Sequence, residues 1–285
     1  MDVPTTIYLA VYAVALLILI SLGLAVIFGM MKVINLAHGE FMMLGAYACV
    51  LCTNAGIPLW LSMAIAAVAL GVFGIVIERI IIRFLYGRLV DTLLATWGLS
   101  LLLVGGVTTL LGPQGRSVTT DFSNVVIGGV NVSSYNLILI VIALALVLIT
   151  WLLAQLTPFG LIVRGTMQDP VMASALGVNR SNVYMATFAY GSALAGLAGA
   201  LLAPITGASP TMGLFFVAKA FITVIVGGQM PLIGTVSASG LFGAIDGIVS
   251  FKWSSVVGEV SVLVVAVILL RLLPSGISGR LRRGL

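Results

Sequence analysis

Four polar or ionisable side chains lie between two strongly apolar runs near the start of the chain. They are Lys32, Asn35, His38 and Glu40, all within segment 32–47. A charge at the centre of a bilayer costs at least about 2.5 kcal/mol, so such residues usually face a cavity or a partner. The cost is far smaller at the boundary of a membrane helix. Two interpretations stand together: Asn35 and Glu40 satisfy backbone amides at a helix start, and the group forms a wall of a transport pathway.

A second segment, 169–177, has the residue order of a short capped helix. Asp169 at the N-cap, Pro170 at the first helical position and Gly177 just past the end are residue types that start and stop helices. An amphipathic helix lying on the bilayer would carry bulky aromatic residues and lysine, and this segment has neither. The pattern favours a small apolar knob that docks into a groove on a partner. Its apolar residues lie on one helical stripe: Val171, Met172, Ala175 and Leu176.

Patterns of catalytic residues are missing from the sequence. It contains no G-x-x-x-x-G-K-[ST] phosphate loop, no metal-ligand cluster and no Ser-His-Asp set. We therefore expect no catalytic residue, no metal site and no cofactor on this chain. If the protein is driven by ATP, the ATPase must be another polypeptide. Cys49 and Cys52 have the spacing of a redox or metal pair. Because they lie in an apolar run and the chain has a single histidine, we interpret them as reduced thiols packed in a membrane helix.

Isolated charges and aromatic residues add further candidates. Lys219 and Asp246 lie in neighbouring apolar stretches, from which they can pair across helices. The four tryptophans, Trp97 among them, mostly lie near the ends of apolar runs, as an interfacial belt requires. Candidate residues of a translocation pathway are Asn35, His38, Glu40, Trp97 and Lys219.

The composition of the chain indicates that lipid, and not water, surrounds most of it. Of the 285 residues, 61% are hydrophobic and 7% are charged, whereas a soluble domain carries roughly 25% charged residues. A chain this apolar cannot hide its surface from water, because surface grows too fast relative to volume. The net charge of +5 is thinly spread and is not gathered beside exposed aromatics, which argues against nucleic-acid binding. We therefore expect an all-α integral membrane protein.

Apolar runs close to the length of about 20 residues that crosses a bilayer follow one another along the chain. We expect a single transmembrane domain, 1–285, made of eight or nine membrane helices. The count depends on the short stretch 214–226, which either crosses or forms half of a broken helix. Polar segments 112–134 and 157–182 are expected outside the bilayer, and 125–132 suits a hairpin. The predicted spans are 7–28, 39–53, 59–82, 92–111 with Asp91 as its N-cap, 135–156, 183–205, 214–226, 232–249 and 256–273.

The positions of the arginines orient the predicted bundle. Most of them fall on one side if the N-terminus is outside and the last three stretches all cross, and that side is cytoplasmic by the positive-inside rule. The N-terminus and segment 112–134 are then periplasmic, and the C-terminus and segment 157–182 are cytoplasmic. The first run lacks a basic flank and a cleavage site, so we expect it to stay as a span. The arginines in question are Arg83, Arg88, Arg164, Arg180, Arg271, Arg280, Arg282 and Arg283.

Several motifs are similar to those of the branched-chain amino acid permease family of bacterial ABC importers. Asn-Leu-Ala-His-Gly-Glu-Phe at 35–41, followed by Leu-Gly-Ala-Tyr at 44–47, resembles the signature of that family. Segment 164–179 resembles its cytoplasmic coupling segment. The similarity covers nearly the whole chain in the same order. The further similar motifs lie at 218–221, 226–228, 233–234 and 273–277.

The resemblance implies an importer in the bacterial inner membrane. This chain and a second permease subunit, identical or homologous, would work with two ATP-binding-cassette ATPase subunits and a periplasmic substrate-binding protein. Closure of the ATPases would move the bundle between outward- and inward-facing states. The implied substrate is a branched-chain amino acid or a related small polar solute, because segment 91–100 is more similar to the urea and short-amide branch. The implied ATPase-coupling helix comprises Asp169, Pro170, Val171, Met172, Ala175, Leu176 and Gly177.

The residues alone leave a function of another class open, a stand-alone channel or ion-coupled carrier for a small polar solute. In that case His38, Glu40 and Asp246 would form a proton or sodium relay. A membrane-embedded enzyme fits poorly, because no catalytic group converges in the sequence.

Overall fold

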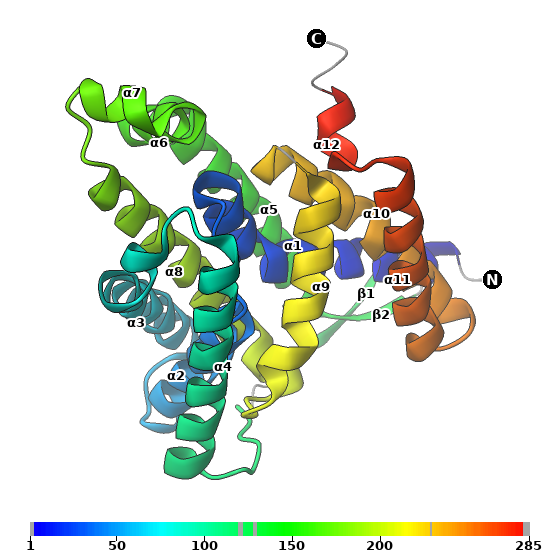
Figure 1. Ribbon diagram of the computed structural model, residues 1–285. Helices are drawn as coiled ribbons and strands as arrows, with labels where there is room; N and C mark the ends of the chain where they lie inside the picture. The colour runs from blue at the N-terminus through cyan, green and yellow to red at the C-terminus, as the bar shows by residue number, and fades with distance from the viewer. Residues whose placement is uncertain (1–2, 119–121, 128–129, 229, 282–285) are drawn as a thin grey trace. The chain divides into compact units, whose positions relative to one another are not determined.

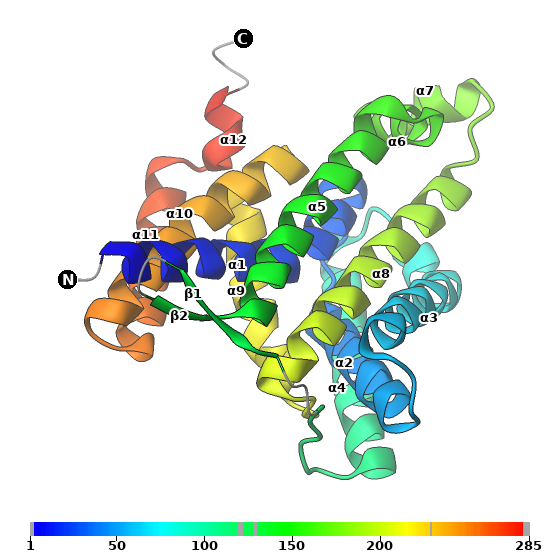
Figure 2. The same cartoon turned by 180° about the vertical axis from the view of Figure 1, so that it is seen from behind.

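The computed structural model describes residues 3–118, 122–127, 130–228 and 230–281 (Figures 1 and 2). This part of the chain is helical apart from one two-stranded hairpin and the connecting loops. The elements in chain order are α1 (Val3–Met31), α2 (His38–Asn54), α3 (Leu59–Ile80), the 3₁₀ helix η1 (Ile82–Leu85), α4 (Leu89–Leu111), β1 (Asn124–Ile127), β2 (Val130–Ser133), α5 (Ser134–Leu156), α6 (Pro158–Gln168), α7 (Pro170–Ala175), α8 (Arg180–Thr206), α9 (Met212–Gly227), α10 (Pro231–Lys252), α11 (Ser255–Leu272) and α12 (Gly276–Leu281).

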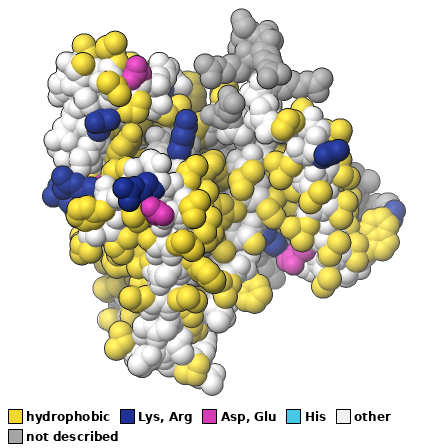
Figure 3. All heavy atoms as spheres, in the orientation of Figure 1, with side chains coloured by type: hydrophobic (Ala, Val, Ile, Leu, Met, Phe, Trp, Pro, Cys, Tyr) yellow, Lys and Arg dark blue, Asp and Glu magenta, His cyan; other side chains and the backbone are white. Residues whose placement is uncertain are grey.

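Seven of the helices described are long and apolar enough to cross a membrane. A helix is suited to this because it satisfies its own backbone hydrogen bonds where no water is present. Charged side chains are sparse on the face seen in Figure 3. The all-α membrane class predicted from composition is confirmed, whereas the number of crossings and the side of each terminus stay predictions. The seven are α1, α3, α4, α5, α8, α10 and α11.

The shorter helices α2 and α9 have 17 and 16 residues, and α9 is the more apolar of the two. At 1.5 Å per residue, each is about 25 Å long, slightly less than the thickness of the hydrocarbon layer. α9 is one unbroken helix that covers the stretch 214–226. Whether this stretch crosses the membrane or forms half of a broken helix stays a prediction.

The predicted hairpin in the first polar segment is confirmed. β1 pairs antiparallel with β2, and Val125 lies opposite Val132. The connecting residues 128 and 129 lie outside the described residues, as do Arg282 and Arg283 of the predicted basic tail. Both cysteines are free thiols, and Cys49 is buried in α2, as predicted.

The predicted start of the fourth span is wrong by a few residues. α4 begins at Leu89 with Arg88 at the N-cap, so Asp91 lies inside the first turn. The Asp91 carboxylate is 3.7 Å from the Arg88 guanidinium, and both side chains are exposed. The physical reason is that the positive end of a helix stabilises an acidic side chain throughout the first turn. An aspartate near a helix start therefore does not by itself fix the cap.

The helices form two compact units. The first unit comprises Leu22–Thr119 and Thr150–Ala218. The second comprises Met1–Ser21, Thr120–Ile149 and Lys219–Leu285. Helices α1, α5 and α9 contribute residues to both. A single transport domain over residues 1–285 stays a prediction.

Close helix packing through glycine holds the first unit together. A Cβ atom on Gly45 of α2 would lie 2.1 Å from the carbonyl oxygen of Gly196 of α8. A Cβ on Gly199 would lie 1.8 Å from the carbonyl oxygen of Met42. Only glycine permits such approach, and backbone proximity drives helix association where lipid removes the hydrophobic effect. The small residues Gly196 and Gly199 thus form a packing face of α8.

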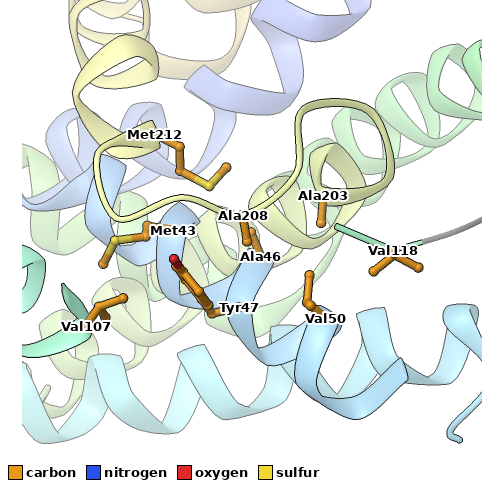
Figure 4. Packing of buried hydrophobic residues seen from close by; sticks show 9 residues of the cluster. All are labelled: Met43, Ala46, Tyr47, Val50, Val107, Val118, Ala203, Ala208 and Met212. Carbon is orange, nitrogen blue, oxygen red and sulfur yellow. The ribbon is translucent and has the colours of Figure 1, made fainter. Parts of the chain in front are cut away.

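A buried apolar cluster lies beside this packing face (Figure 4). Two loops meet next to it, because Arg116 and Ala208 exchange backbone hydrogen bonds of 2.8 and 2.7 Å. The bridge ties the chain after α4 to the chain after α8. The cluster is made of Met43, Ala46, Tyr47, Val50, Val107, Val118, Ala203, Ala208 and Met212.

The second unit also relies on glycine contacts and on one serine. A Cβ on Gly243 of α10 would lie 2.4 Å from the backbone nitrogen of Val14 of α1. The Ser278 hydroxyl of α12 donates to the carbonyl oxygen of Gly227 at 2.6 Å and accepts from the Met230 amide at 2.9 Å. Ser278 therefore ties α12 to the turn between α9 and α10.

The contact between Gly199 and Met42 predicts a selective loss of stability. Gly199→Ala adds a methyl group where no space exists, and overpacking of this kind costs about 1–3 kcal/mol. We expect a lower thermal unfolding midpoint for the detergent-purified protein. Gly105→Ala in α4 is the matched control, since a Cβ there meets no atom within 4 Å. Equal midpoints for the two variants would contradict the assigned role of the α2–α8 contact.

Candidate functional site

The segment between α5 and α8 contains two short helices, and the second, α7, has caps at both ends. The Asp169 carboxylate accepts hydrogen bonds from the Val171 and Met172 amides, both at 2.9 Å. Pro170 occupies the first turn. Gly177 follows the helix with φ of +86°, a conformation that favours glycine. The start and stop residues predicted from the sequence therefore form the helix ends that were expected.

The outer face of α7 is apolar and exposed. Val171, Met172 and Leu176 are 73%, 57% and 78% exposed, whereas Ala173 faces inward and is buried. Hydrophobic side chains accordingly gather at the upper left of Figure 3, over α6 and α7. Exposed apolar residues held on a capped helix are characteristic of a surface that meets another protein.

The helix α6, which precedes α7, was not anticipated in the sequence. Its N-cap is Thr157, whose hydroxyl accepts from the Gly160 amide at 3.0 Å, and Pro158 follows at the first helical position. Val163 lies on its buried face, three residues after Gly160. The Thr-Pro pair is the signal that identifies this helix start. α6 places α7 beside the beginning of α8 (Figure 2).

The linker between α1 and α2 is anchored on α4. The Leu36 amide donates to the Thr96 hydroxyl at 3.1 Å. The Asn35 side-chain oxygen accepts from the Ala37 amide at 3.1 Å, so Asn35 does satisfy a backbone amide just before α2. Lys32 has φ of +53°, in the left-handed region that side chains rarely adopt. The chain thus turns sharply after α1 and is held in place before α2 begins.

His38 and Glu40 follow in the first turn of α2, and both are fully buried. The Glu40 carboxyl faces the Ser100 hydroxyl of α4. Neither of its oxygens makes a hydrogen bond of standard geometry within the described residues. The His38 ring lies against Gly23 of α1. A buried polar group without a hydrogen bond costs roughly 1–3 kcal/mol, so the Glu40 carboxyl is a costly feature enclosed by helix packing.

Trp97 and Lys219, two further candidates for the pathway, lie on exposed faces. Trp97 is 54% exposed on α4. The Lys219 ammonium is 2.7 Å from a carboxylate oxygen of Glu259 on α11. The expected pairing of Lys219 with Asp246 is therefore wrong, and Asp246 instead accepts from the Ser250 hydroxyl at 3.0 Å. Which charges meet depends on how each helix is rotated about its own axis, and the spacing of residues in the sequence does not give that rotation.

The predicted pathway residues thus fall into separate groups. Asn35, His38 and Glu40 form one buried cluster in the first unit, while Trp97 is exposed on α4. Lys219 belongs to the second unit. Their assignment to a translocation pathway stays a prediction.

A tyrosine cluster at the end of α3, also missed in the sequence, connects α3 to α8. The Tyr86 hydroxyl donates to the buried Glu78 carboxylate. The Tyr86 ring packs on Tyr184 of α8 with 4.8 Å between ring centroids. Burial, together with this hydrogen bond to Glu78, raises the pKa of the Tyr86 phenol far above its usual value. Tyr86 therefore stays a neutral donor at physiological pH.

Curated proteins similar to this chain are described as permease proteins of branched-chain amino acid transport. BraD of Pseudomonas aeruginosa, a high-affinity branched-chain amino acid transport system permease protein, is 30% identical over 284 residues, covering 92% of this chain and 91% of that protein. LivH of Escherichia coli, described in the same words, is 27% identical over 280 residues, with 92% and 91% coverage. A probable LivH permease of Methanocaldococcus jannaschii is 27% identical over 286 residues, with 93% and 89% coverage.

The fold has a counterpart among solved structures. A chain of PsaBC from Streptococcus pneumoniae, solved in complex with Fab, superposes with a TM-score of 0.51. The alignment covers 94% of this chain and 90% of that one at 15% sequence identity. At this identity the likeness concerns the fold alone.

The family assignment follows from the extent of the sequence match. The model of the family described as branched-chain amino acid transport system, permease component, matches residues 6–273, nearly the full length. Together with the apolar helices, this identifies a multi-pass membrane protein. The chain belongs to the family of branched-chain amino acid transport system permease components.

Proposed function

We propose that this chain is the membrane permease subunit of an ATP-binding-cassette importer in the bacterial inner membrane. It would move branched-chain amino acids, or a related small polar solute such as urea or a short amide. The full-length similarity to permease proteins of branched-chain amino acid transport supports this proposal. These relatives are transport subunits, so the chain's own task is to form the passage, and ATP would be hydrolysed on partner subunits.

The exposed face of α7 is the observation that carries the proposal. An isolated helix of six residues is too short to be stable in water, yet this one is held by an aspartate cap and a left-handed glycine. A helix whose two ends are held in this way suits a rigid contact that transmits a partner's movement to the membrane helices. We assign the groove that receives it to an ATPase subunit.

The proposed assembly has two ATPase subunits, a second permease subunit and a periplasmic substrate-binding protein. In the proposed topology the N-terminus is periplasmic, α7 is cytoplasmic, and α2 and α9 cross in addition to the seven longer helices. The arginines at 83, 88, 164 and 180 support this orientation, since they lie in the connections on the α7 side.

The caps of α7 predict that glycine at position 177 is essential for coupling. Gly177→Leu forces a bulky side chain into a left-handed conformation, at a cost of about 1–2 kcal/mol, and we expect α7 to lose its orientation. ATP-dependent uptake by the reconstituted importer should fall at least fivefold, while membrane insertion stays normal. Gly165→Leu is the matched control, because a side chain there also meets open space but the backbone has no positive φ. Equal uptake by the two variants would remove α7 from the coupling path.

The apolar face of α7 predicts a second effect, on assembly. Leu176→Asp places a charge where we expect an apolar groove, and co-purification of the ATPase subunits should drop by an order of magnitude. Asn179→Asp is the matched control, because it adds the same charge three residues away. It also keeps the side-chain oxygen that accepts a hydrogen bond from the Asn182 amide, at 3.3 Å in the wild type. Quantitative immunoblots of the purified complex measure the recovery of ATPase subunits with each variant. Full ATPase recovery with Leu176→Asp would show that the partner docks elsewhere.

A further inference from the structure

Three charged side chains lie at a similar level in three apolar helices of the second unit. Lys219 is seven residues from the start of α9, Asp246 is six residues from the end of α10, and Glu259 is four residues from the start of α11. These distances are about 10, 9 and 6 Å along the helices. Short connections join the three helices, so in the proposed topology, where all three cross, the start of α9, the end of α10 and the start of α11 face the same side of the membrane.

Each of the three charged side chains makes a polar contact within the second unit. The Lys219 ammonium lies 2.7 Å from Glu259, and the two side chains are 36% and 52% exposed. Asp246 is half-buried, with the Ser250 hydroxyl at 3.0 Å. Gly258, the neighbour of Glu259, packs against this pair, since a Cβ there would lie 2.6 Å from the Asp246 carboxylate. Asp246 therefore lies beside the turn of α11 that carries Glu259.

This arrangement is poorly suited to a face surrounded by lipid. Charges several ångströms inside the hydrocarbon layer are costly and normally face a cavity or a partner. A pair that served only to hold two helices together would be expected to be enclosed by them, yet both members are open to the outside of the chain. The exposed sides of Lys219 and Glu259 therefore look onto a polar space, which in a permease is the passage itself.

We propose that Lys219 and Glu259 form a binding site for the charged groups of a zwitterionic amino acid, an inference that rests on the proposed function. The Lys219 ammonium binds the α-carboxylate, and the Glu259 carboxylate binds the α-ammonium. Asp246 adds negative potential on the side of Glu259. Opposite charges at hydrogen-bond distance match a solute whose own opposite charges are attached to one carbon atom.

The same chemistry separates the substrate classes left open by the sequence. A neutral solute such as urea gains little from a cation and an anion that already satisfy each other, whereas a zwitterion bonds to both. In the proposed topology, the charges lie in the outer half of the membrane, where a solute arriving from a periplasmic binding protein first enters. The site thus favours amino acids over urea and short amides.

The test uses the complete importer in proteoliposomes, with leucine and urea as probes. Lys219→Met combined with Glu259→Gln removes both charges but keeps side-chain size. We expect ATP-dependent leucine uptake to fall at least tenfold with an unchanged unfolding midpoint. Arg88→Gln combined with Asp91→Asn, which neutralises the exposed pair at the start of α4, is the matched control and should transport as the wild type does.

A charge-swapped variant, Lys219→Glu with Glu259→Lys, separates binding from a structural tie. It restores the attraction between α9 and α11 but reverses the polarity that orients the amino acid, so uptake should stay at least tenfold low. Recovery of leucine uptake in the swapped variant, or full leucine uptake in the neutralised variant, would contradict the proposed binding site. ATP-dependent uptake of urea in place of leucine by the wild type overturns the site and leaves the permease function intact. Absence of ATP-dependent uptake of either probe removes the proposed function and this site with it.

Discussion

The absence of water around most of this chain is the constraint on which the rest of its structure depends. In hydrocarbon, backbone groups must pair within helices, and a charge requires a partner or a polar space. The few charges inside the membrane helices are therefore informative. Glu40 is enclosed beside Ser100, whereas Lys219 and Glu259 pair on an exposed face. The first arrangement is part of the interior packing, and the second points to a passage.

The same solvent explains how the helices hold together. Lipid is as apolar as the side chains, so association depends on close packing and not on exclusion of water. Gly196 and Gly199 bring α8 against α2, and α8 begins a few residues after the end of α7. Tyr86 links the start of α8 to α3 through Tyr184 and Glu78. A displacement of α7 by an ATPase would thus reach α3 and α8 together.

Local signals in the sequence predicted local structure well. The caps of α7 were predictable because Asp169 and Gly177 act on backbone groups within three residues of themselves. The hairpin was predictable for a similar reason. Features that depend on distant residues were not, such as the pairing of Lys219 with Glu259 across 40 residues, because it requires knowledge of how α9 and α11 are rotated. The position of Asp91 was missed since the helix dipole favours acids at several first-turn positions.

The account treats the chain as a passage that a separate ATPase opens and closes, and dependence on that ATPase is its central claim. The most direct measurement compares leucine uptake into proteoliposomes that hold this chain with its permease partner, with and without the ATPase subunits and ATP, in the presence of the binding protein. The account predicts accumulation only when ATPase subunits and ATP are both present. Equal uptake by liposomes that lack the ATPase would contradict it and would identify the chain as a channel or an ion-coupled carrier.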